Sequence, residues 1–183
     1  MAGPSSVPQS ASEIDAHAIV LETERLRLRR MSEAHAGFLL ELLNEPAFIE
    51  NVADRGVRTL AQAKEFIAER ILASYQKYGF GFYVVELKEG RIPAGICGLV
   101  KRETLDDVDI GYALLARHCG KGYAYEAAAA LLDYGRTTLK LPKIVAVTTP
   151  GNQSSIKLLE KLGLKFEKVI HLPGYGAESL LFT

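Results

Sequence analysis

Apolar and polar residues alternate along the first part of the chain that carries large apolar side chains. Within residues 19–30, Leu26 and Leu28 each have an arginine on either side. A period of two is typical of a strand with one buried face. The pattern predicts a first strand over residues 19–30.

Two segments then carry apolar residues at helical spacing. Ser32 is a favourable N-cap for a helix whose apolar face contains Phe38, Leu39, Leu42 and Leu43, with Pro46 at its end or at the start of a short helix over 47–52. Thr59 and Gln62 match a capping box, and helical spacing continues from there to Gly79. The pattern predicts helices over both segments.

The next segments have the composition of strands. Residues 80–88, 92–102 and 109–116 are rich in aromatic and β-branched residues and are separated by short polar turns. Pro93 should lie at the start or the edge of its strand, because proline cannot donate a ladder hydrogen bond. A three-strand meander is the simplest arrangement.

A helix beginning near Gly122 is followed by the apolar run Ile144–Thr148, and strand, helix and strand at this spacing predict a parallel pair with a right-handed crossover. A helix over 152–162 and a hairpin of 166–171 with 177–183 complete the chain. The predicted fold class is α/β (α+β), with a mixed, mostly antiparallel sheet flanked by helices.

The turn before the long helix contains Gly120, Lys121 and Gly122. The first turn of a helix has amide groups without partners and a partial positive charge, so it can hold a phosphate. The glycines allow a bulky anion to approach the backbone, and the lysine adds a positive charge. This turn is therefore a candidate phosphate site.

Two common phosphate-binding motifs do not fit this turn. A Walker loop needs four residues between its glycine and a Gly-Lys-Ser/Thr end, and a dinucleotide fingerprint needs a small residue where this chain has Tyr125. A Gly-Lys-Gly turn is also an ordinary way to begin a helix. These three residues alone leave both interpretations open.

The composition of the chain argues against several kinds of binding partner. The 183 residues are 48% hydrophobic and 24% charged, which is typical of one globular domain. The 22 Lys and Arg residues balance 22 Asp and Glu, so no global basic field favours nucleic acid or a membrane surface. Cys97 and Cys119 have neither CxxC spacing nor a histidine at zinc-ligand spacing, which argues against a metal site and favours a reducing compartment.

The N-terminal segment differs in composition from the rest of the chain. Residues 1–18 are rich in Ser, Ala and Pro, so we expect a flexible N-terminal tail before a single domain over 19–183. Apolar runs stay shorter than a membrane span, and the start lacks the charged-then-apolar pattern of a secretory signal. We therefore expect a cytoplasmic protein.

Two separated motifs, taken together, resemble the GCN5-related N-acetyltransferases (GNAT). The first is Ile110-Gly111-Tyr112 with the turn at 120–124, and the second is the run from Asn152 to Gly163. The order of elements agrees as well, and the run ETERLRLR at 22–29 resembles the branch of ribosomal-protein N-terminal acetyltransferases. The resemblance covers nearly everything after the tail and implies acetyl-CoA as the acyl donor substrate.

The pyrophosphate motif of that family fits this chain in two registers. The motif is Gln or Arg, two residues, Gly, one residue, and Gly or Ala. Arg117 with Gly120 and Gly122 fits it, and Cys119 with Gly122 and Ala124 fits it if the first position varies. We prefer the second register, because the branch usually has an aromatic residue where Cys119 stands. Backbone amides hold the phosphates in either case.

The resemblance also implies that the strand before the turn splays from its parallel neighbour and that the pantetheine arm of acetyl-CoA lies in the gap. Asn152 would bond the arm from the other side, and it can act as a plain N-cap at the same time. The cofactor-binding residues implied in this way are Leu114, Leu115, Ala116, Cys119, Gly120, Lys121, Gly122, Tyr123, Ala124, Asn152 and Ser155.

Acetyl transfer requires a neutral amine and a proton for the leaving thiolate. At neutral pH, deprotonation costs roughly 1 kcal/mol for an α-amine and roughly 5 kcal/mol for a lysine amine. Asp109 matches the position where the branch usually has Glu, so it is the candidate base, directly or through water; a solvated strand-edge carboxylate is the alternative. Where many relatives have a tyrosine acid this chain has Leu159, so Ser155 is the first candidate acid and Tyr112 the second.

Two functions remain open on the sequence. One is acetyl transfer to a primary amine, on a protein N-terminus or a small molecule, in a ternary complex. The other is a non-catalytic acyl-CoA-binding or regulatory module, in which the missing tyrosine and the Asp in place of Glu signal lost catalysis. Residues 50–58 and 172–176 are expected to wall the acceptor site, although they select no acceptor. The chain is expected to be a monomer or a homodimer, without nucleic acid, membrane or metal partners.

Overall fold

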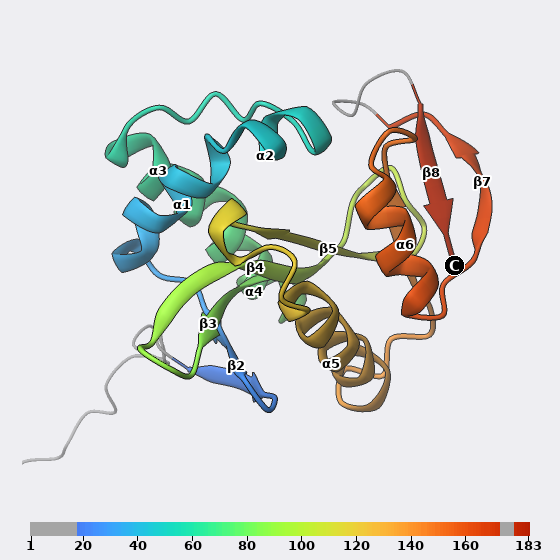
Figure 1. Cartoon of the computed structure of the whole chain (residues 1–183), viewed down its shortest axis with the longest axis horizontal. Coiled ribbons are helices and arrows are strands. Elements are labelled where there is room, and N and C mark those ends of the chain that lie inside the picture. The colour runs from blue at the N-terminus through green and yellow to red at the C-terminus, as the bar shows by residue number, and fades with distance from the viewer. Residues whose placement is uncertain (1–17, 173–177) are drawn as a thin grey trace, which may run out of the picture.

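The computed structural model describes residues 18–172 and 178–183, so the predicted tail lies outside the described residues except for Ala18, and so does the turn at 173–176. The described elements are built around a sheet of eight strands in the order β1-β2-β3-β4-β5-β6-β8-β7 (Figure 1). The strands are β1 (Ile19–Glu22), β2 (Leu26–Arg30), β3 (Phe82–Leu87), β4 (Ile92–Val100), β5 (Val108–Leu114), β6 (Ile144–Thr148), β7 (Phe166–Ile170) and β8 (Ser179–Phe182).

The alternating segment 19–30 forms two strands and not the one that we predicted. The N–H of Thr23 donates to the carbonyl of Leu26 at 3.0 Å, and the N–H of Leu26 donates to Oγ1 of Thr23 at 3.0 Å, which closes a hairpin turn. The single-strand prediction was wrong because a threonine hydroxyl can close a turn without interrupting a period of two. The alternation persists in β2, where Leu26 and Leu28 are fully buried.

The sheet is mixed and mostly antiparallel, as predicted. Strands β1 to β5 pair antiparallel in chain order, and Pro93 lies near the start of β4, beside a register shift in β3 between Val85 and Glu86. Strand β6 runs parallel to β5, and β8 lies between β6 and β7. The meander and the parallel pair are therefore both confirmed.

Strands β5 and β6 separate beyond Ile110. Their pairing ends at Ile110 with Ala146, whereas β5 continues to Leu114 and the end of β6 pairs with β8. The second half of β5 has no neighbour on this side among the described strands. Its backbone groups on that edge are thus left for a ligand. This is the divergence that the family resemblance implied.

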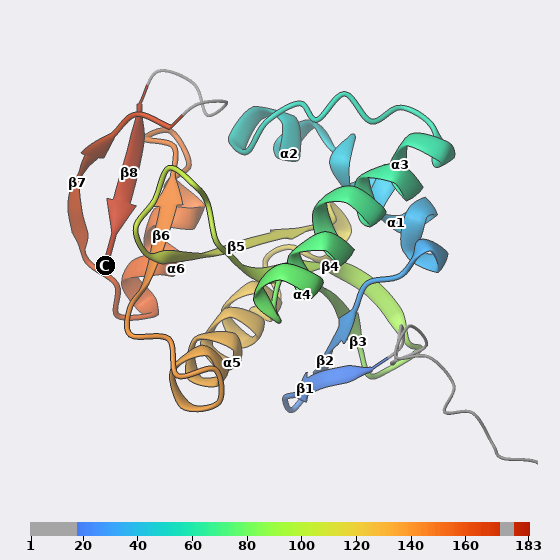
Figure 2. The ribbon, with the colours of Figure 1, turned by 180° about the vertical axis from the view of Figure 1, so that it is seen from behind.

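Helices cover both faces of the sheet. Helices α3 and α4 lie on one face and α5 and α6 on the other, as the two opposite views show (Figures 1 and 2). The π-helical segment Ile67–Leu72 joins α3 to α4 in one continuous helix, which begins at the predicted Thr59–Gln62 capping box and ends at Gly79 (φ +81°). The helices are α1 (Ala36–Leu43), α2 (Pro46–Asn51), α3 (Leu60–Phe66), α4 (Ala73–Tyr78), α5 (Tyr123–Thr137) and α6 (Gln153–Lys161).

The hydrophobic core lies against the centre of the sheet. It includes Leu99 and Ile110 from β4 and β5, Leu131 from α5 and Leu39 from α1, each almost completely buried. These contacts fix β4, β5 and α5 with respect to one another, so the turn at 120–122 has a defined position. Across residues 18–172 and 178–183, none of the helices combines the length and the apolar character needed to cross a membrane.

Candidate active site

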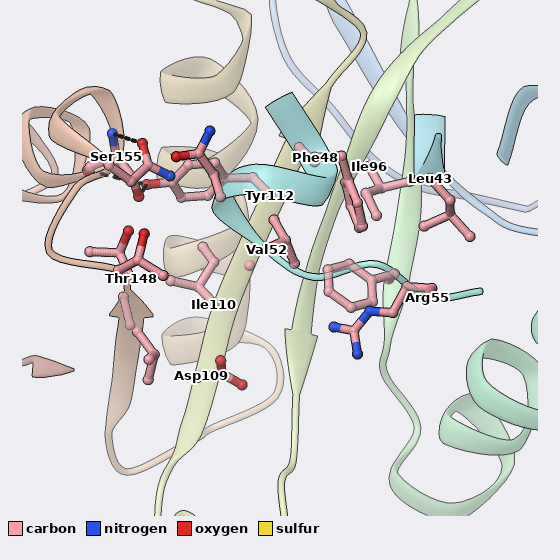
Figure 3. A pocket seen from close by; sticks show the side chains of 18 of the residues that line it. Leu43, Phe48, Val52, Arg55, Ile96, Asp109, Ile110, Tyr112, Thr148 and Ser155 are labelled. Carbon is pink, nitrogen blue, oxygen red and sulfur yellow. Dashed lines mark hydrogen bonds between the residues drawn. The ribbon is translucent and has the colours of Figure 1, made fainter. Parts of the chain in front are cut away.

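A groove follows the part of β5 that has left β6. Its walls come from α2, residues 112–114 of β5, the turn at 119–122 and the first residues of α5 and α6. An inner cavity continues from it beneath α1 and α2, over β4 and β5 (Figure 3). The residues that line both include Tyr112, Asn152 and Ser155, so the groove and the inner cavity meet at these side chains.

A third depression, the outer groove, lies between the 54–57 loop, the α3–α4 helix and the ends of β3 and β4. It shares Arg55, Phe66, Ile71 and Phe82 with the inner cavity. The inner cavity therefore lies between the groove and the outer groove and shares lining residues with both.

The Gly-Lys-Gly turn forms a cradle at one end of the groove. Gly120 and Gly122 have φ angles of +74° and +81°, a conformation that side chains with a Cβ rarely adopt. Gly122 is the N-cap of α5, so the first amides of this helix, which have no partners within it, lie beside the groove. Of the predicted cradle residues, Cys119, Gly120, Gly122, Tyr123 and Ala124 all line the groove.

Three predicted cofactor residues, Leu115, Ala116 and Lys121, do not line the groove. Leu115 is fully buried, and its N–H donates to the carbonyl of Ala94 at 2.9 Å. The N–H of Ala116 donates to Glu45 Oε1 at 3.3 Å. Because β5 ends at Leu114 and the chain turns into a short 3-10 helix, Leu114 is the one of the three predicted strand residues that borders the groove.

The two registers of the pyrophosphate motif place different residues at the groove. The guanidinium of Arg117 is hydrogen-bonded to the carboxylate of Glu41, and Arg117 is not among the residues that line the groove. Cys119 lines it, with its sulfur 3.7 Å from the carbonyl oxygen of Leu115. This placement favours the Cys119 register.

A contact that we did not predict from the sequence holds the cradle. The carboxylate of Glu126 in α5 accepts hydrogen bonds from the Thr23 hydroxyl at 2.6 Å, from the Arg25 amide at 2.8 Å and from Arg25 Nε at 2.7 Å. Nη1 of Arg25 also donates to the carbonyl of Lys121 at 3.0 Å, and its guanidinium lies 4.6 Å from the centre of the Tyr123 ring. The β1–β2 turn thus braces the cradle; the run at 22–29 and Glu126, both part of the family resemblance, were the available signal.

The start of α6 forms the opposite wall of the groove. Oδ1 of Asn152 accepts from the amide of Ser155 at 3.1 Å, which confirms its role as N-cap. The Tyr112 hydroxyl lies 3.0 Å from Oγ of Ser155, and either group can donate. Burial raises the pKa of Tyr112 to about 12, so its hydroxyl keeps its proton at neutral pH. The two hydroxyls form a proton-donating pair where the groove meets the inner cavity.

Asp109 lies in the wall of the inner cavity and is only 1% exposed. It is therefore not the solvated strand-edge carboxylate that we kept as an alternative. Its Oδ2 accepts from Arg102 Nε at 2.9 Å, while Oδ1 has no partner among the other described residues. Burial raises the pKa of Asp109, and the positive charge of Arg102 partly opposes that rise. A carboxylate with a raised pKa is a better proton acceptor at neutral pH.

Residues 25–165 match the sequence model of the acetyltransferase (GNAT) domain. The chain belongs to the GNAT family. The N-acetyltransferase p20 of Bacillus licheniformis is 34% identical over 152 residues, which are 82% of this chain and 84% of that protein. An acetyltransferase from Agrobacterium tumefaciens str. C58 has a similar structure, with a TM-score of 0.74, 28% identity, and coverage of 88% of this chain and 91% of that one.

This GNAT chain also shares its fold with the ribosomal L7/L12 alpha-N-protein acetyltransferase RimL, which was solved in complex with CoA. The TM-score is 0.77 at 18% identity, over 90% of this chain and 96% of the RimL chain. Together the comparisons establish an N-acetyltransferase of the GNAT family and a GNAT fold. The expectation of an enzyme is confirmed, while the acceptor is not identified.

The loop expected to wall the acceptor site of this GNAT enzyme does border the inner cavity. Asn51, Val52 and Arg55 line it, and an ion pair of 2.6 Å between Asp54 and Arg58 tightens the loop behind them. Of the other expected wall, at 172–176, only Leu172 is among the described residues, and it lines neither the groove nor the inner cavity. Across the described part of the chain, no group of three or more His, Cys, Asp or Glu side chains could hold a metal ion.

Proposed function

We propose that this enzyme transfers the acetyl group of acetyl-CoA directly to a primary amine while both substrates are bound. The observation that carries the proposal is the meeting of the groove and the inner cavity at Tyr112 and Ser155. A donor in the groove and an acceptor in the inner cavity would present the thioester and the amine to each other there. Holding two reactants in this way removes much of the entropic barrier to their reaction.

The groove suits the shape and charge of acetyl-CoA. The pyrophosphate would lie at the amides of residues 120–125, where the start of α5 is positive. The pantetheine arm would lie along the open edge of β5 near Leu114, whose backbone can bond its amides as a neighbouring strand would. Asn152 lines the same groove, and since its oxygen already caps α6, its NH₂ group is the part left to donate to the arm.

The proton transfers follow from the two polar positions along the cavity. Oδ1 of Asp109, directly or through water, would take a proton from the acceptor ammonium, and the neutral nitrogen would attack the thioester carbon. As the carbon–sulfur bond breaks, the thiolate would take a proton from Ser155, with Tyr112 hydrogen-bonded behind it. The other amine proton leaves to solvent. The products are an amide and free CoA. Water then takes the proton from Asp109 and returns a proton to Ser155.

Similarity to the ribosomal-protein branch supports a protein N-terminus as one acceptor class. The support comes from the run at 22–29 and from the fold shared with RimL. The chemistry agrees, because an α-amine is much easier to deprotonate than a lysine amine at neutral pH. A small-molecule amine of low pKa meets the same chemical requirement.

The test is an assay of CoA release and acetylated product with a panel of peptides and small amines. We expect at least one acceptor to give equal amounts of CoA and N-acetyl product. The melting temperature of the protein with and without acetyl-CoA is measured in parallel. If acetyl-CoA raises the melting temperature and no amine consumes it, the non-catalytic alternative holds for that panel.

A further inference from the structure

The inner cavity is lined mostly by apolar side chains, together with the charged side chain of Arg55. Leu43, Phe48, Val52 and Ile96 gather on the side opposite Ser155 (Figure 3), and Phe66 continues this surface toward the outer groove. Such a surface favours a ligand whose far end is hydrocarbon, because burial of apolar area is the main favourable term for a small ligand.

Negative charge in the inner cavity is limited to one group. Asp109 is the only acidic residue among the described residues that line it. One oxygen of this carboxylate is hydrogen-bonded to Arg102, and the other, Oδ1, has no partner among the other described residues. A buried acceptor without a partner is unfavourable unless a ligand supplies the donor. The cavity therefore offers one negatively charged partner for an ammonium group.

We propose that the acceptor is a primary monoamine whose amino group is attached to an apolar group, and that amines with a second positive charge are disfavoured. The inference rests on the proposed function, which places the acceptor in the inner cavity. A single amine meets Oδ1 of Asp109 while its hydrocarbon part covers Phe48 and Ile96. A second ammonium that stays within the inner cavity would lie against apolar side chains and the positively charged Arg55, with no second carboxylate among the described lining residues, which is strongly unfavourable.

Two ligands of equal length test this selectivity. Hexylamine and 1,5-diaminopentane differ by replacement of a terminal methyl group with a second ammonium. Their binding is measured by calorimetry on the full chain saturated with CoA, so that no transfer takes place. We expect hexylamine to bind at least about tenfold more tightly. Equal affinities, or tighter binding of the diamine, would overturn the proposal.

A variant at the mouth of the cavity tests the same point from the protein side. Phe66 is partly buried and lies where the inner cavity meets the outer groove, so a charge is tolerable there. Phe66→Glu supplies a second carboxylate and should narrow the preference for hexylamine by about tenfold, while the matched Phe66→Leu keeps the cavity apolar and should preserve it. An unchanged preference for hexylamine in a folded Phe66→Glu protein counts against the proposal. If this variant does not fold, the binding comparison with the wild-type protein decides the proposal.

Transfer assays with the same amines separate this proposal from the proposed function. If hexylamine binds more tightly but is not acetylated, the selectivity of the cavity is supported and the proposed function fails for this amine. If the diamine is acetylated as efficiently as hexylamine, transfer is supported and the selectivity fails. The alternative ligand for the apolar surface of the inner cavity is a long acyl chain on the donor. Tighter binding of hexanoyl-CoA than of acetyl-CoA, with no preference between the amines, would overturn the monoamine proposal.

Discussion

At the scale of single residues, two opposing effects act on the pKa of Asp109. Its burial favours the protonated acid, and the guanidinium of Arg102 at 2.9 Å favours the carboxylate. Burial is the larger of the two, so the pKa of Asp109 lies above the usual carboxyl range. A carboxylate with a raised pKa binds a proton more readily, which is what a general base for amine deprotonation needs.

Replacing Asp109 by Asn should lower kcat for acetyl transfer about a hundredfold, because general base help is lost. The Kd for CoA should stay within about twofold, since Asp109 does not line the groove that we assign to CoA. Steady-state kinetics and calorimetry give the two values. Asp107→Asn is the control, because Asp107 pairs with Lys143 on the surface at 3.5 Å. An unchanged kcat in Asp109→Asn would remove this residue from its proposed role.

Replacing Arg102 by Gln should move the acidic limb of the pH profile of kcat/KM to higher pH. The charge of Arg102 lowers the pKa of Asp109, so its loss lets burial raise that pKa further. The base is then protonated, and inactive, up to a higher pH than in the wild type. The amine titrates identically with both proteins, so the shift between the two profiles is the measurement. A shift to lower pH contradicts the assignment.

At the scale of elements, β5 is held tightly to β4 where it has left β6. A Cβ placed on Gly95 of β4 would lie 2.3 Å from the carbonyl oxygen of Ala113 and 2.8 Å from Cα of Leu114. These are backbone atoms, which cannot turn away as a side chain can. The absence of a side chain at Gly95 thus allows the close strand contact that positions the groove wall.

Replacing Gly95 by Ala should reduce the free energy of unfolding by about 1–3 kcal/mol, the usual effect of overpacking. Because the clash lies at Leu114, the affinity for CoA should fall as well. Gly37→Ala is the matched control: nothing lies within 4 Å of a Cβ there, and alanine favours the helix α1 that contains Gly37. Chemical denaturation measures both variants. Equal stability of the two would show that β4 and β5 can relax at this point.

At the scale of the whole molecule, the first hairpin and the cradle depend on each other. Arg25 and Glu126 are 101 positions apart in the chain, yet three hydrogen bonds join the hairpin turn to this carboxylate. The first described hairpin therefore supports the turn that we propose as the phosphate site. Arg25 acts on the site by positioning Lys121 and Tyr123.

Replacing Arg25 by Ala should raise the Kd for CoA about threefold to tenfold, a moderate effect because its side chain is 45% exposed. The value of kcat at saturating acetyl-CoA should change little, since Arg25 contacts Glu126, Lys121 and Tyr123 at the cradle, whereas Tyr112 and Ser155 lie where the groove adjoins the inner cavity. Arg27→Ala is the control, because Arg27 pairs with Glu22 at 2.6 Å and does not contact the cradle. An equal loss of CoA affinity in both variants would contradict a role for Arg25 in positioning the cradle.

Local sequence alone determined most of the elements. Periodicity, the Thr59–Gln62 capping box and the glycines at 79 and 163 predicted helices and strands that the structure contains, because these signals act between residues a few positions apart. The Gly-Lys-Gly turn and Asn152 were recognisable in the same way, as local helix starts. The exception, the hairpin within 19–30, depended on one side-chain hydrogen bond that a period of two does not reveal.

Only the tertiary structure decided how the chemistry is assembled. The burial of Asp109 against Arg102, the Tyr112–Ser155 contact, and the bracing of the cradle by Arg25 all join residues through space. The inner cavity likewise exists because α1 and α2 cover β4 and β5 at a point where no side chain fills the gap. Such contacts depend on how strands and helices pack. A one-dimensional pattern records the character of each surface but not which surfaces meet.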